Sequence, residues 1–256
     1  MRKIILIFFA TALTVLGWIV YEFTTIDEKI LTVKTTPTPT AEAPGMPPTV
    51  TTDAGTYAYA YSMADVGSIS LLPNFEKKSA AASLAETNRC LKYISGGFYD
   101  TAGKPLGFFY TDNKTYAPRI QSSLVNGFLW ADAGGISISS SLPDSTYRFA
   151  MQVGPRLLQS GNVLPLRIQN DEHARRMVVA TASDGKPIFL AVYNADSVYE
   201  GPLLAQLPEV VATISREKQL SIADAVNLDG GSASAFSNGE IRLSELTPVG
   251  SLLCVK

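Results

Sequence analysis

Short stretches of alternating apolar and polar residues recur along the chain, and this period of two is typical of half-buried β-strands. Residues 56–62 (TYAYAYS) alternate aromatic with small side chains. The apolar runs 177–181 and 188–193 flank the turn sequence SDGK, which predicts a β-hairpin. A second hairpin is predicted for residues 126–130 and 135–139, on either side of an Asp-Ala-Gly turn.

The remaining pattern adds more strands than helices. Further strands are predicted at residues 90–95, 106–110, 147–153, 223–229, 241–243 and 251–255. An Ala-rich helix is predicted over 79–87 with Ser79 as its N-cap, and a second helix over 201–215. Pro208 interrupts the second pattern, so that helix is either kinked there or begins later. This content predicts an α+β fold, with a single domain built on a largely antiparallel sheet and a few helices.

The N-terminal pattern is different, because residues 4–21 are apolar and uncharged. A helix of this length would span roughly 27 Å, close to the hydrocarbon thickness of a bilayer. Basic residues precede the run and acidic residues follow it, so the positive-inside rule places the N-terminus in the cytoplasm and the domain outside. No small-x-small cleavage site follows Tyr21, which favours an uncleaved transmembrane anchor; a cleaved signal peptide is the alternative.

Composition divides the chain into three parts. Residues 1–32 hold the anchor or signal and a juxtamembrane segment, and residues 33–52 are Thr/Pro-rich, which predicts an extended linker. Residues 53–256 form the domain and are enough for a sizeable core. The formal net charge is −2 and there is no long basic run, so nucleic-acid binding has no electrostatic footprint in this sequence.

The chain has two cysteines, Cys90 and Cys254. They form either one disulfide in an exported domain or two buried free thiols, and their spacing does not decide between these alternatives. The same spacing does not predict a zinc site. Residues 113–115 (NKT) match the N-glycosylation pattern, but the short anchor and simple linker favour a bacterial protein, so we interpret this match as chance.

The strongest chemical signal is the segment 227–234 (NLDGGSAS). At the end of a predicted strand, Asn227 and Asp229 point to one side while their apolar neighbours face the core. An amide and a carboxylate are thereby presented together beside Gly230 and Gly231, whose backbone is open to a ligand. The alternative is an ordinary Asp-Gly-Gly turn.

Three more glycine-marked or arginine-marked segments precede this motif. They are ISGGFYD at 94–100 with Pro-Leu-Gly at 105–107, VGPRLL at 153–158, and ARRMVV at 174–179. In this order the four segments resemble the phosphodiester glycosidase family over about residues 90–236. Ser95 stands where the family usually has Asn, and the glycine run at 230–231 is shorter than the three-glycine variant.

The resemblance implies hydrolysis at the anomeric carbon of a sugar bonded to phosphate, where oxocarbenium character develops. Asp229 would be the carboxylate at that carbon, Arg176 would bind the phosphate, and Asn227 would bind sugar hydroxyls or orient Asp229. A turn-capping role for Asp229 and a surface role for Arg176 are the alternatives. The predicted substrate-binding residues are Gly96, Gly97, Asp100, Gly154, Gly230, Gly231 and Ser232, of which Asp100 is equally well explained as a turn residue.

Other polar residues add little to this picture. His173 is the only histidine and lies in a polar run, so it is predicted to be exposed and not catalytic. The oxygens of Asp229 and Asn227 are ligands that Ca²⁺ or Mg²⁺ accepts. Nothing in the sequence requires such an ion, and no cofactor is predicted.

The sequence therefore predicts an exported, membrane-anchored hydrolase that cleaves a sugar-phosphate diester in envelope glycans or related glycoconjugates. A noncatalytic glycan-binding module is the alternative, kept open by Ser95 and the shortened glycine run. A purely structural envelope protein is a third interpretation. The sugar, the stereochemical outcome and the oligomeric state are not specified by the sequence.

Overall fold

The computed structural model describes residues 46–144 and 146–256. The chain separates into Met1–Met46 and Pro47–Lys256, and the fold below belongs to the second unit. The predicted anchor and the linker up to residue 45 lie outside the described residues. Within the described part of the chain, no helix is long and apolar enough to cross a membrane.

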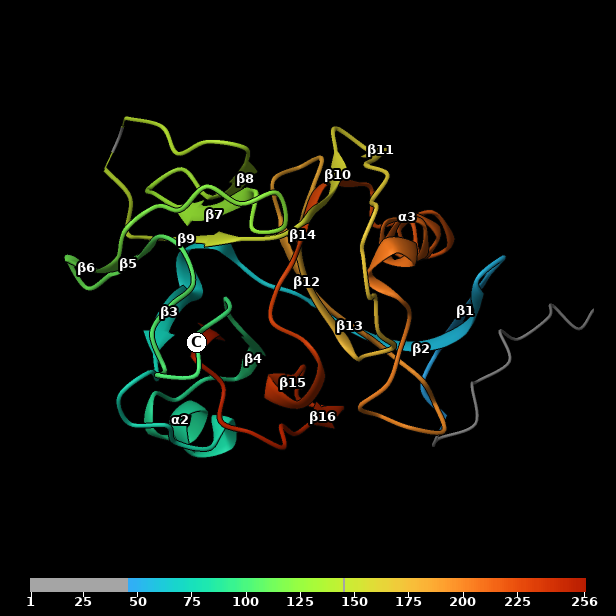
Figure 1. Ribbon diagram of the computed structural model, residues 1–256, viewed down its shortest axis with the longest axis horizontal. Helices are drawn as coiled ribbons and strands as arrows, with labels where there is room; N and C mark the ends of the chain where they lie inside the picture. Colours follow the sequence, from blue (N-terminus) through green and yellow to red (C-terminus); the bar gives the residue numbers. More distant parts are fainter. Residues whose placement is uncertain (1–45, 145) are drawn as a thin grey trace, which may run out of the picture. The chain divides into compact units, whose positions relative to one another are not determined.

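The domain is α+β, with three antiparallel sheets and two α-helices (Figure 1). The largest sheet, called here the large sheet, has seven strands in the order β1-β2-β13-β12-β14-β10-β11. Its strands are β1 (Thr49–Thr52), β2 (Gly55–Met63), β10 (Arg156–Gln159), β11 (Asn162–Val163), β12 (Arg176–Ala182), β13 (Pro187–Tyr193) and β14 (Ile222–Asn227).

Two five-stranded sheets complete the domain. The β17 sheet has the order β16-β15-β4-β17-β3, and the β9 sheet has the order β6-β5-β9-β7-β8. The strands of the β17 sheet are β3 (Ile69–Pro73), β4 (Lys92–Ser95), β15 (Phe236–Ser237), β16 (Arg242–Leu243) and β17 (Ser251–Val255). Those of the β9 sheet are β5 (Phe109–Thr111), β6 (Lys114–Ala117), β7 (Gly127–Ala131), β8 (Ile136–Ser139) and β9 (Phe149–Val153). Three sheets thus replace the single sheet that the sequence predicted, because strands distant in sequence pair within each one.

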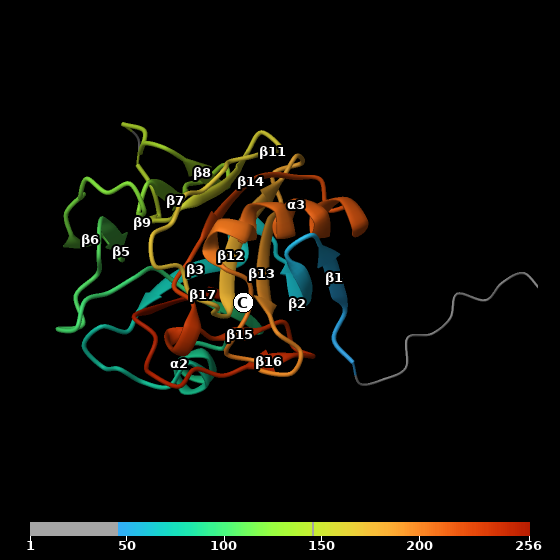
Figure 2. The same ribbon diagram turned by 45° about the vertical axis from the view of Figure 1, so that its right-hand side comes forward.

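The large sheet separates two apolar cores. Along β12, Met177 and Val179 point into a core shared with the β17 and β9 sheets, whereas Val178 and Ala180 point into a core shared with α3 (Leu207–Glu217). Alternate strand residues reach opposite faces, so one buried strand serves both cores. Figure 2 shows α3 lying over one face of β12 and β13.

The helices differ from the predicted ones at their N-termini. Helix α2 spans Ala81–Thr87 and its N-cap is Ala80, so Ser79 is not the cap. The N–H of Ala81 donates instead to the Glu245 carboxylate at 2.6 Å, which supplies an acceptor from a distant part of the chain. Helix α3 begins at Leu207, with Pro208 in its first turn, which confirms the alternative of a later start.

Strand boundaries also differ where the chain changes partner. Strand β1 lies inside the range predicted as linker, because Val50 is buried and pairs with Tyr57 of β2. Strand β14 ends at Asn227, two residues early. The N–H of Leu228 still donates to the carbonyl of Met177 in β12 at 2.8 Å. The next N–H, that of Asp229, donates instead to the carbonyl of Gly96, which follows β4 of the β17 sheet. Three short 3₁₀ turns complete the described elements: η1 (Val66–Ser68), η2 (Leu204–Gln206) and η3 (Gly231–Ala233).

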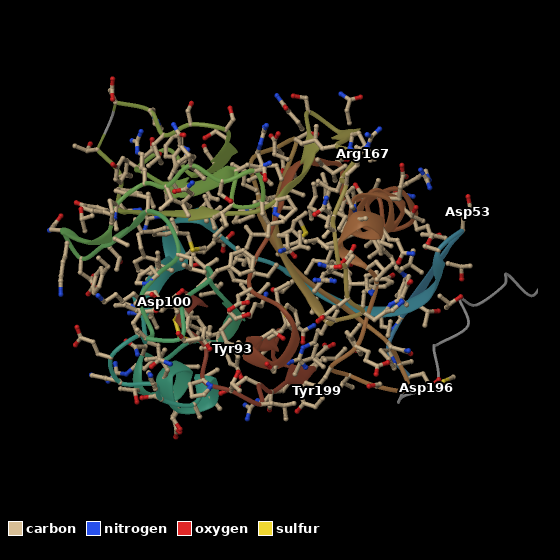
Figure 3. The ribbon with its side chains drawn as sticks, in the orientation of Figure 1. Asp53, Tyr93, Asp100, Arg167, Asp196 and Tyr199 are labelled. Carbon is tan, nitrogen blue, oxygen red and sulfur yellow. A yellow bond between two sulfur atoms is a disulfide. The ribbon has the colours of Figure 1, made fainter. Side chains whose placement is uncertain are left out.

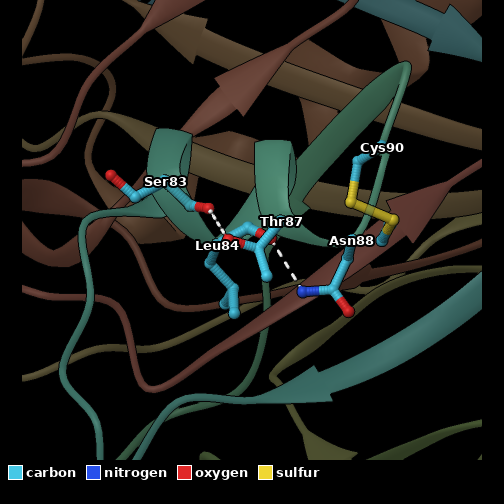
Figure 4. The surroundings of a disulfide bond; sticks show 6 residues. Ser83, Leu84, Thr87, Asn88 and Cys90 are labelled. Atoms are coloured by element: carbon cyan, nitrogen blue, oxygen red, sulfur yellow. Dashed lines mark hydrogen bonds between the residues drawn. A yellow bond between two sulfur atoms is a disulfide. The ribbon is translucent and has the colours of Figure 1, made fainter.

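Cys90 and Cys254 form a disulfide, which resolves the alternatives left open by the sequence (Figure 4). Cys90 follows the last turn of α2, where Asn88 donates to the carbonyl of Leu84 at 2.8 Å. Cys254 lies in β17 and is fully buried. The bond joins residues 164 positions apart. It therefore ties α2 to the C-terminal strand and reduces the conformational entropy of the unfolded chain. This effect typically raises the free energy of unfolding by about 2–4 kcal/mol.

Candidate functional site

The first and last glycine motifs meet at Asp229, just beyond the end of β14. The N–H of Asp229 donates to the carbonyl of Gly96 at 3.0 Å, and the Ser95 hydroxyl donates to the carbonyl of Asp229 at 3.3 Å. Gly96 in turn donates its N–H to Ser251 of β17 at 2.9 Å. The chain therefore crosses from the large sheet to the β17 sheet at Asp229, and backbone hydrogen bonds fix it there.

The carboxyl group of Asp229 has a raised pKa. Burial raises its pKa from 3.8 to about 7, and a hydrogen bond from the backbone N–H of Gly230 opposes this rise. Neither ion pair formed by the described residues includes Asp229. Without a cation to favour the charged form, the group is divided between acid and carboxylate near neutral pH. Such a pKa is typical of a group that donates or accepts a proton in catalysis.

Tyr99 lies near enough to Asp229 to feel its charge, Thr247 contacts Tyr99, and sequence reasoning singled out neither residue. The pKa of Tyr99 is raised by burial, lowered by a hydrogen bond with Thr247 and raised further by the charge of Asp229. The Tyr99 hydroxyl donates to the carbonyl of Pro248 at 2.5 Å. Tyr99 belongs to the ISGGFYD segment, so the motif itself was a usable signal. Thr247 is distant from every motif, and no local signal marks it.

Asn227 joins the closing motif to the Gly-Pro segment. Its Nδ2 donates to the carbonyl of Gly154 at 3.0 Å, and the N–H of Gly154 donates to the carbonyl of Asn227 at 3.1 Å. The side chain is 2% exposed, and its Oδ1 has no hydrogen-bond partner among the described residues. A buried amide oxygen usually accepts a hydrogen bond. This acceptor is therefore available to a ligand.

Arg176 lies on the same face of the large sheet as Asn227, because Asn227 is opposite Val178, two residues along β12. Its guanidinium is engaged nearby, donating to the carbonyl of Pro202 at 3.0 Å and to that of Glu172, and lying 3.4 Å from the Asp171 carboxylate. Burial lowers the pKa of Arg176, and the two acidic residues oppose that effect. None of its hydrogen bonds to the described residues reaches Asp229 or Gly96.

Arg175, rather than its neighbour, contacts the glycine turn after Asp229. Its carbonyl accepts the N–H of Gly231 at 2.8 Å. Its guanidinium donates to the hydroxyl and the carbonyl of Ser234 at 2.8 and 2.5 Å, and to the carbonyl of Ser244 at 2.8 Å. The Ser234 hydroxyl then donates to the carbonyl of Gly231 at 2.5 Å. This fully buried arginine therefore holds both ends of the 231–234 turn.

The guanidinium of Arg175 also contacts the loop that follows β13. It donates to the carbonyl of Val198 at 3.1 Å and lies 4.9 Å from the ring centroid of Tyr199, which Figure 3 labels. Burial lowers the pKa of Arg175, while Tyr199 and Glu245 oppose that effect. A cation over an aromatic face is favoured electrostatically, which offsets part of the cost of burying the charge.

Four other residues considered in the sequence lie in different surroundings. The Asp100 carboxylate accepts the N–H of Lys104 at 2.8 Å, the geometry of a turn-stabilising residue, on the side of the domain that holds β3 and β4 (Figure 3). Ser232 is exposed, and its carbonyl accepts the N–H of Thr247 at 3.0 Å. Gly97 is buried against Val153 of β9. Nδ1 of His173 lies 2.8 Å from the carbonyl of Gly201.

The described residues contain no group of three or more His, Cys, Asp or Glu side chains that could hold a metal ion. The side chains of Asp229 and Asn227 offer at most three oxygen donors. This donor set is too small to fit a resident Ca²⁺ or Mg²⁺, which take six or more oxygen ligands.

The backbone of Gly96 lies close to Ser251, and a substitution at Gly96 therefore tests the junction between the first and last motifs. A Cβ at Gly96 would collide with the hydroxyl of the fully buried Ser251 and lie 3.2 Å from the Ser251 Cβ. We expect Gly96→Ala to lower the free energy of unfolding by about 2 kcal/mol, as overpacking in a dense core does. Urea unfolding monitored by tryptophan fluorescence measures the change.

Two further variants separate this collision from a general effect of adding a methyl group. Gly67→Ala is the matched control, because a Cβ there meets nothing within 4 Å, and we expect a change within about 0.5 kcal/mol. Ser251→Ala in the Gly96→Ala background removes the colliding hydroxyl and should restore part of the lost stability. Equal stability of the Gly96→Ala and Gly67→Ala variants would contradict the junction described above.

Comparison with known proteins gives one family and several similar folds. A family model described as phosphodiester glycosidase matches residues 88–256. The catalytic domain of zebrafish N-acetylglucosamine-1-phosphodiester alpha-N-acetylglucosaminidase, auto-inhibited by its pro-peptide, has a similar structure, with TM-score 0.62 and 18% identity over 81% of this chain and 80% of that one. A hypothetical protein from Synechocystis gives TM-score 0.53 and 16% identity over 82% of this chain and 61% of that one. No curated protein sequence matches this chain.

Proposed function

The chain belongs to the phosphodiester glycosidase family, and on that basis we propose that it hydrolyses the bond between the anomeric carbon of a sugar and a phosphodiester. One observation identifies Asp229 as the residue on which the proposal depends. A largely buried carboxyl group, Asp229, has a pKa of about 7 at the point where the first and last motifs of the family meet. A structural turn residue gains nothing from such a pKa, whereas a catalytic one does.

The proposed reaction adds one water molecule across the sugar–phosphate linkage. The bond between C1 and the bridging oxygen breaks, and the departing phosphomonoester takes the electron pair of that bond. The hydroxyl group of the water is added to C1, and the remaining proton is released to solvent. The ionised form of Asp229 supplies negative charge at C1 as oxocarbenium character develops, either by activating the water or by attacking C1 itself. Phosphate is a good leaving group, so protonation of the bridging oxygen contributes less than for an alkyl glycoside.

The other motif residues have supporting roles in this proposal. The free Oδ1 of Asn227 would accept a hydrogen bond from a sugar hydroxyl. Arg176 would bind the phosphate, which requires its guanidinium to exchange part of its present contact with Asp171 for the ligand. The glycines at 96–97 and 230–231 would let the backbone lie close to the substrate, although the N–H groups of Gly96 and Gly231 already donate to Ser251 and Arg175. Gly154 positions Asn227 in this arrangement, and Ser232 lies at the exposed edge of the turn.

The disulfide and the predicted anchor support a location outside the cytoplasm. Disulfides persist in oxidising compartments, so Cys90–Cys254 supports a location outside the cytoplasm. An uncharged run at 4–21 behind a basic N-terminus supports attachment to the membrane. Together they support action on glycans or glycoconjugates of the cell envelope.

The proposal is tested with two substrates that contain the same sugar and differ only in the leaving group at C1. The name of the zebrafish protein points to N-acetylglucosamine as the first sugar to use. The full-length chain is incubated with the methyl phosphodiester of N-acetylglucosamine 1-phosphate and, separately, with methyl α-N-acetylglucosaminide. We expect free sugar and methyl phosphate from the diester and no sugar from the glycoside. Binding of the diester without any hydrolysis, across a panel of sugars, would show a glycan-binding module instead.

A further inference from the structure

Three large apolar side chains are exposed on two loops that border the candidate site. Leu106, Ile120 and Leu124 are 42%, 40% and 41% exposed. Together they are called here the apolar rim. Isolated exposed apolar residues are ordinary on a protein surface, but a group of them beside a ligand site indicates contact with an apolar ligand or partner.

The side chain of Gln152 holds the two loops together. Its Oε1 accepts the N–H groups of Phe108 and Ile120 at 3.2 and 3.0 Å, and its Nε2 donates to the carbonyls of Ile120 and Val125 at 2.8 and 2.9 Å. Gln152 is only 5% exposed, its hydrogen bond to Val125 is buried and the other three are partly buried. The loops are therefore fixed by a satisfied polar network, and the rim is displayed by a rigid support.

A hydrogen bond and a close packing contact connect the rim to the site residues. The N–H of Leu106 donates at 2.8 Å to the carbonyl of Phe98, which follows Gly97 in the chain. The carbonyl of Leu124 fills the space beside the Cα of Gly154, and Gly154 exchanges two hydrogen bonds with Asn227. Both loops thus border the turns proposed to receive the sugar phosphate.

A cation lies within the same loop. Arg119 is exposed, and its guanidinium lies 5.7 Å from the ring centroids of both Phe108 and Phe128. It takes part in neither ion pair formed by the described residues. A positive charge held beside exposed hydrocarbon is complementary to a molecule that carries a phosphate next to an alkyl chain.

We infer that the apolar rim binds the hydrocarbon chain of the alcohol esterified to the substrate phosphate, so that the substrate is a sugar 1-phospholipid. The inference rests on the proposed function, whose leaving group it specifies. A protein partner is a poorer fit, because three partly exposed side chains fall far short of the roughly 800 Å² per partner that a stable interface buries. A membrane anchor at 4–21, as the sequence predicts, would also keep the domain among lipids.

The test compares esters of one sugar 1-phosphate that carry methyl, butyl or hexyl groups, each used below its critical micelle concentration. Each fully buried methylene strengthens binding about fourfold. We expect KM to fall at least about tenfold from methyl to hexyl while kcat changes little. No hydrolysis of any ester would contradict the proposed function itself. Hydrolysis with the same KM for all three esters would leave that function standing and overturn the lipid inference.

Two sets of substitutions locate the effect on the surface. The rim variant carries Leu106→Ser, Ile120→Ser and Leu124→Ser, and the matched control replaces three other exposed apolar residues by Met63→Ser, Leu91→Ser and Val198→Ser. We expect the rim variant to hydrolyse the methyl ester normally and to lose the dependence of KM on chain length. The control should keep that dependence. A chain-length effect that persists in the rim variant, or a concentration-dependent dimer that only this variant loses, would overturn the inference.

Discussion

Asp229→Asn is expected to lower kcat/KM on a sugar 1-phosphodiester by about 10²–10⁴-fold, the range for loss of a positioned acid or base. Asparagine has nearly the same shape, and the backbone bond to Gly96 does not depend on the side chain. The loss therefore reports on the carboxylate itself. Initial rates of sugar release at fixed pH measure it.

The matched control for this variant is Asp224→Asn. Asp224 lies in the same strand, β14, and its carboxylate accepts the N–H of Ser160 at 3.2 Å, away from the Gly96 junction. We expect kcat/KM of that variant to stay within about twofold of the wild-type value. Comparable losses in both variants would show that the strand, rather than the Asp229 carboxylate, had been disturbed.

The pH dependence follows from the same group. Because the pKa of Asp229 is about 7 in the folded protein, the reactive carboxylate is formed as the pH rises through 7. We expect kcat/KM to increase about tenfold per pH unit below this value and to level off above it. This limb of the profile should be absent from the residual activity of Asp229→Asn. Activity that instead falls as the pH rises through 7 would assign Asp229 the role of a general acid.

The raised pKa also has a consequence for stability, with a definite sign. Between pH 4 and pH 7 the folded state holds a proton on Asp229 that the unfolded chain has already released. Rising pH therefore lowers the free energy of unfolding over this window, by at most about 4 kcal/mol from this group. Asp229→Asn removes this dependence, so we expect the variant to be more stable than the wild type at pH 8. A site that trades stability for function behaves in this way.

The parts of the fold that the sequence predicted correctly are those set by neighbouring residues. The β7–β8 and β12–β13 hairpins were predicted because each turn joins strands that pair with one another. The division into three sheets was not, because it depends on partners far apart in the chain, such as Cys254 of β17 opposite Tyr93 of β4. A period of two shows that a strand has two faces but does not show what covers either face.

The same limit applies to the candidate site. The motif order indicated that the segments around Gly96 and Asp229 belong together, and the structure joins them by a backbone hydrogen bond. The motif also directed attention to Arg176 rather than Arg175. Adjacent residues at a strand start point to opposite faces, and only the packing of the β17 sheet shows that Arg175 faces the glycine turn.

Arg175→Ala is expected to lower the free energy of unfolding by about 4 kcal/mol. The substitution removes four hydrogen bonds donated by the guanidinium to Ser234, Ser244 and Val198. It leaves the hydroxyl and carbonyl oxygens of the fully buried Ser234 without this donor, whereas the acceptors on the exposed Ser244 and Val198 can turn to water. Each unpaired buried acceptor costs about 1–3 kcal/mol, and relaxation recovers part of the total. Urea unfolding with the disulfide intact measures the change. Arg167→Ala, at an exposed position labelled in Figure 3, is the control and should change stability by less than about 0.5 kcal/mol.

Arg175→Lys distinguishes a structural role from a positioning role. Lysine keeps the positive charge but cannot donate in the fixed geometry of the guanidinium, so the 231–234 turn should lose part of its support while the domain remains folded. We expect kcat to fall about tenfold or more with little change in KM, because a small displacement of a reacting group is costly in the transition state. The pH at which kcat/KM levels off should also move, since the burial of Asp229 depends on the position of this turn. Unchanged kcat and an unchanged pH profile in a destabilised Arg175→Lys protein would limit Arg175 to holding the fold together.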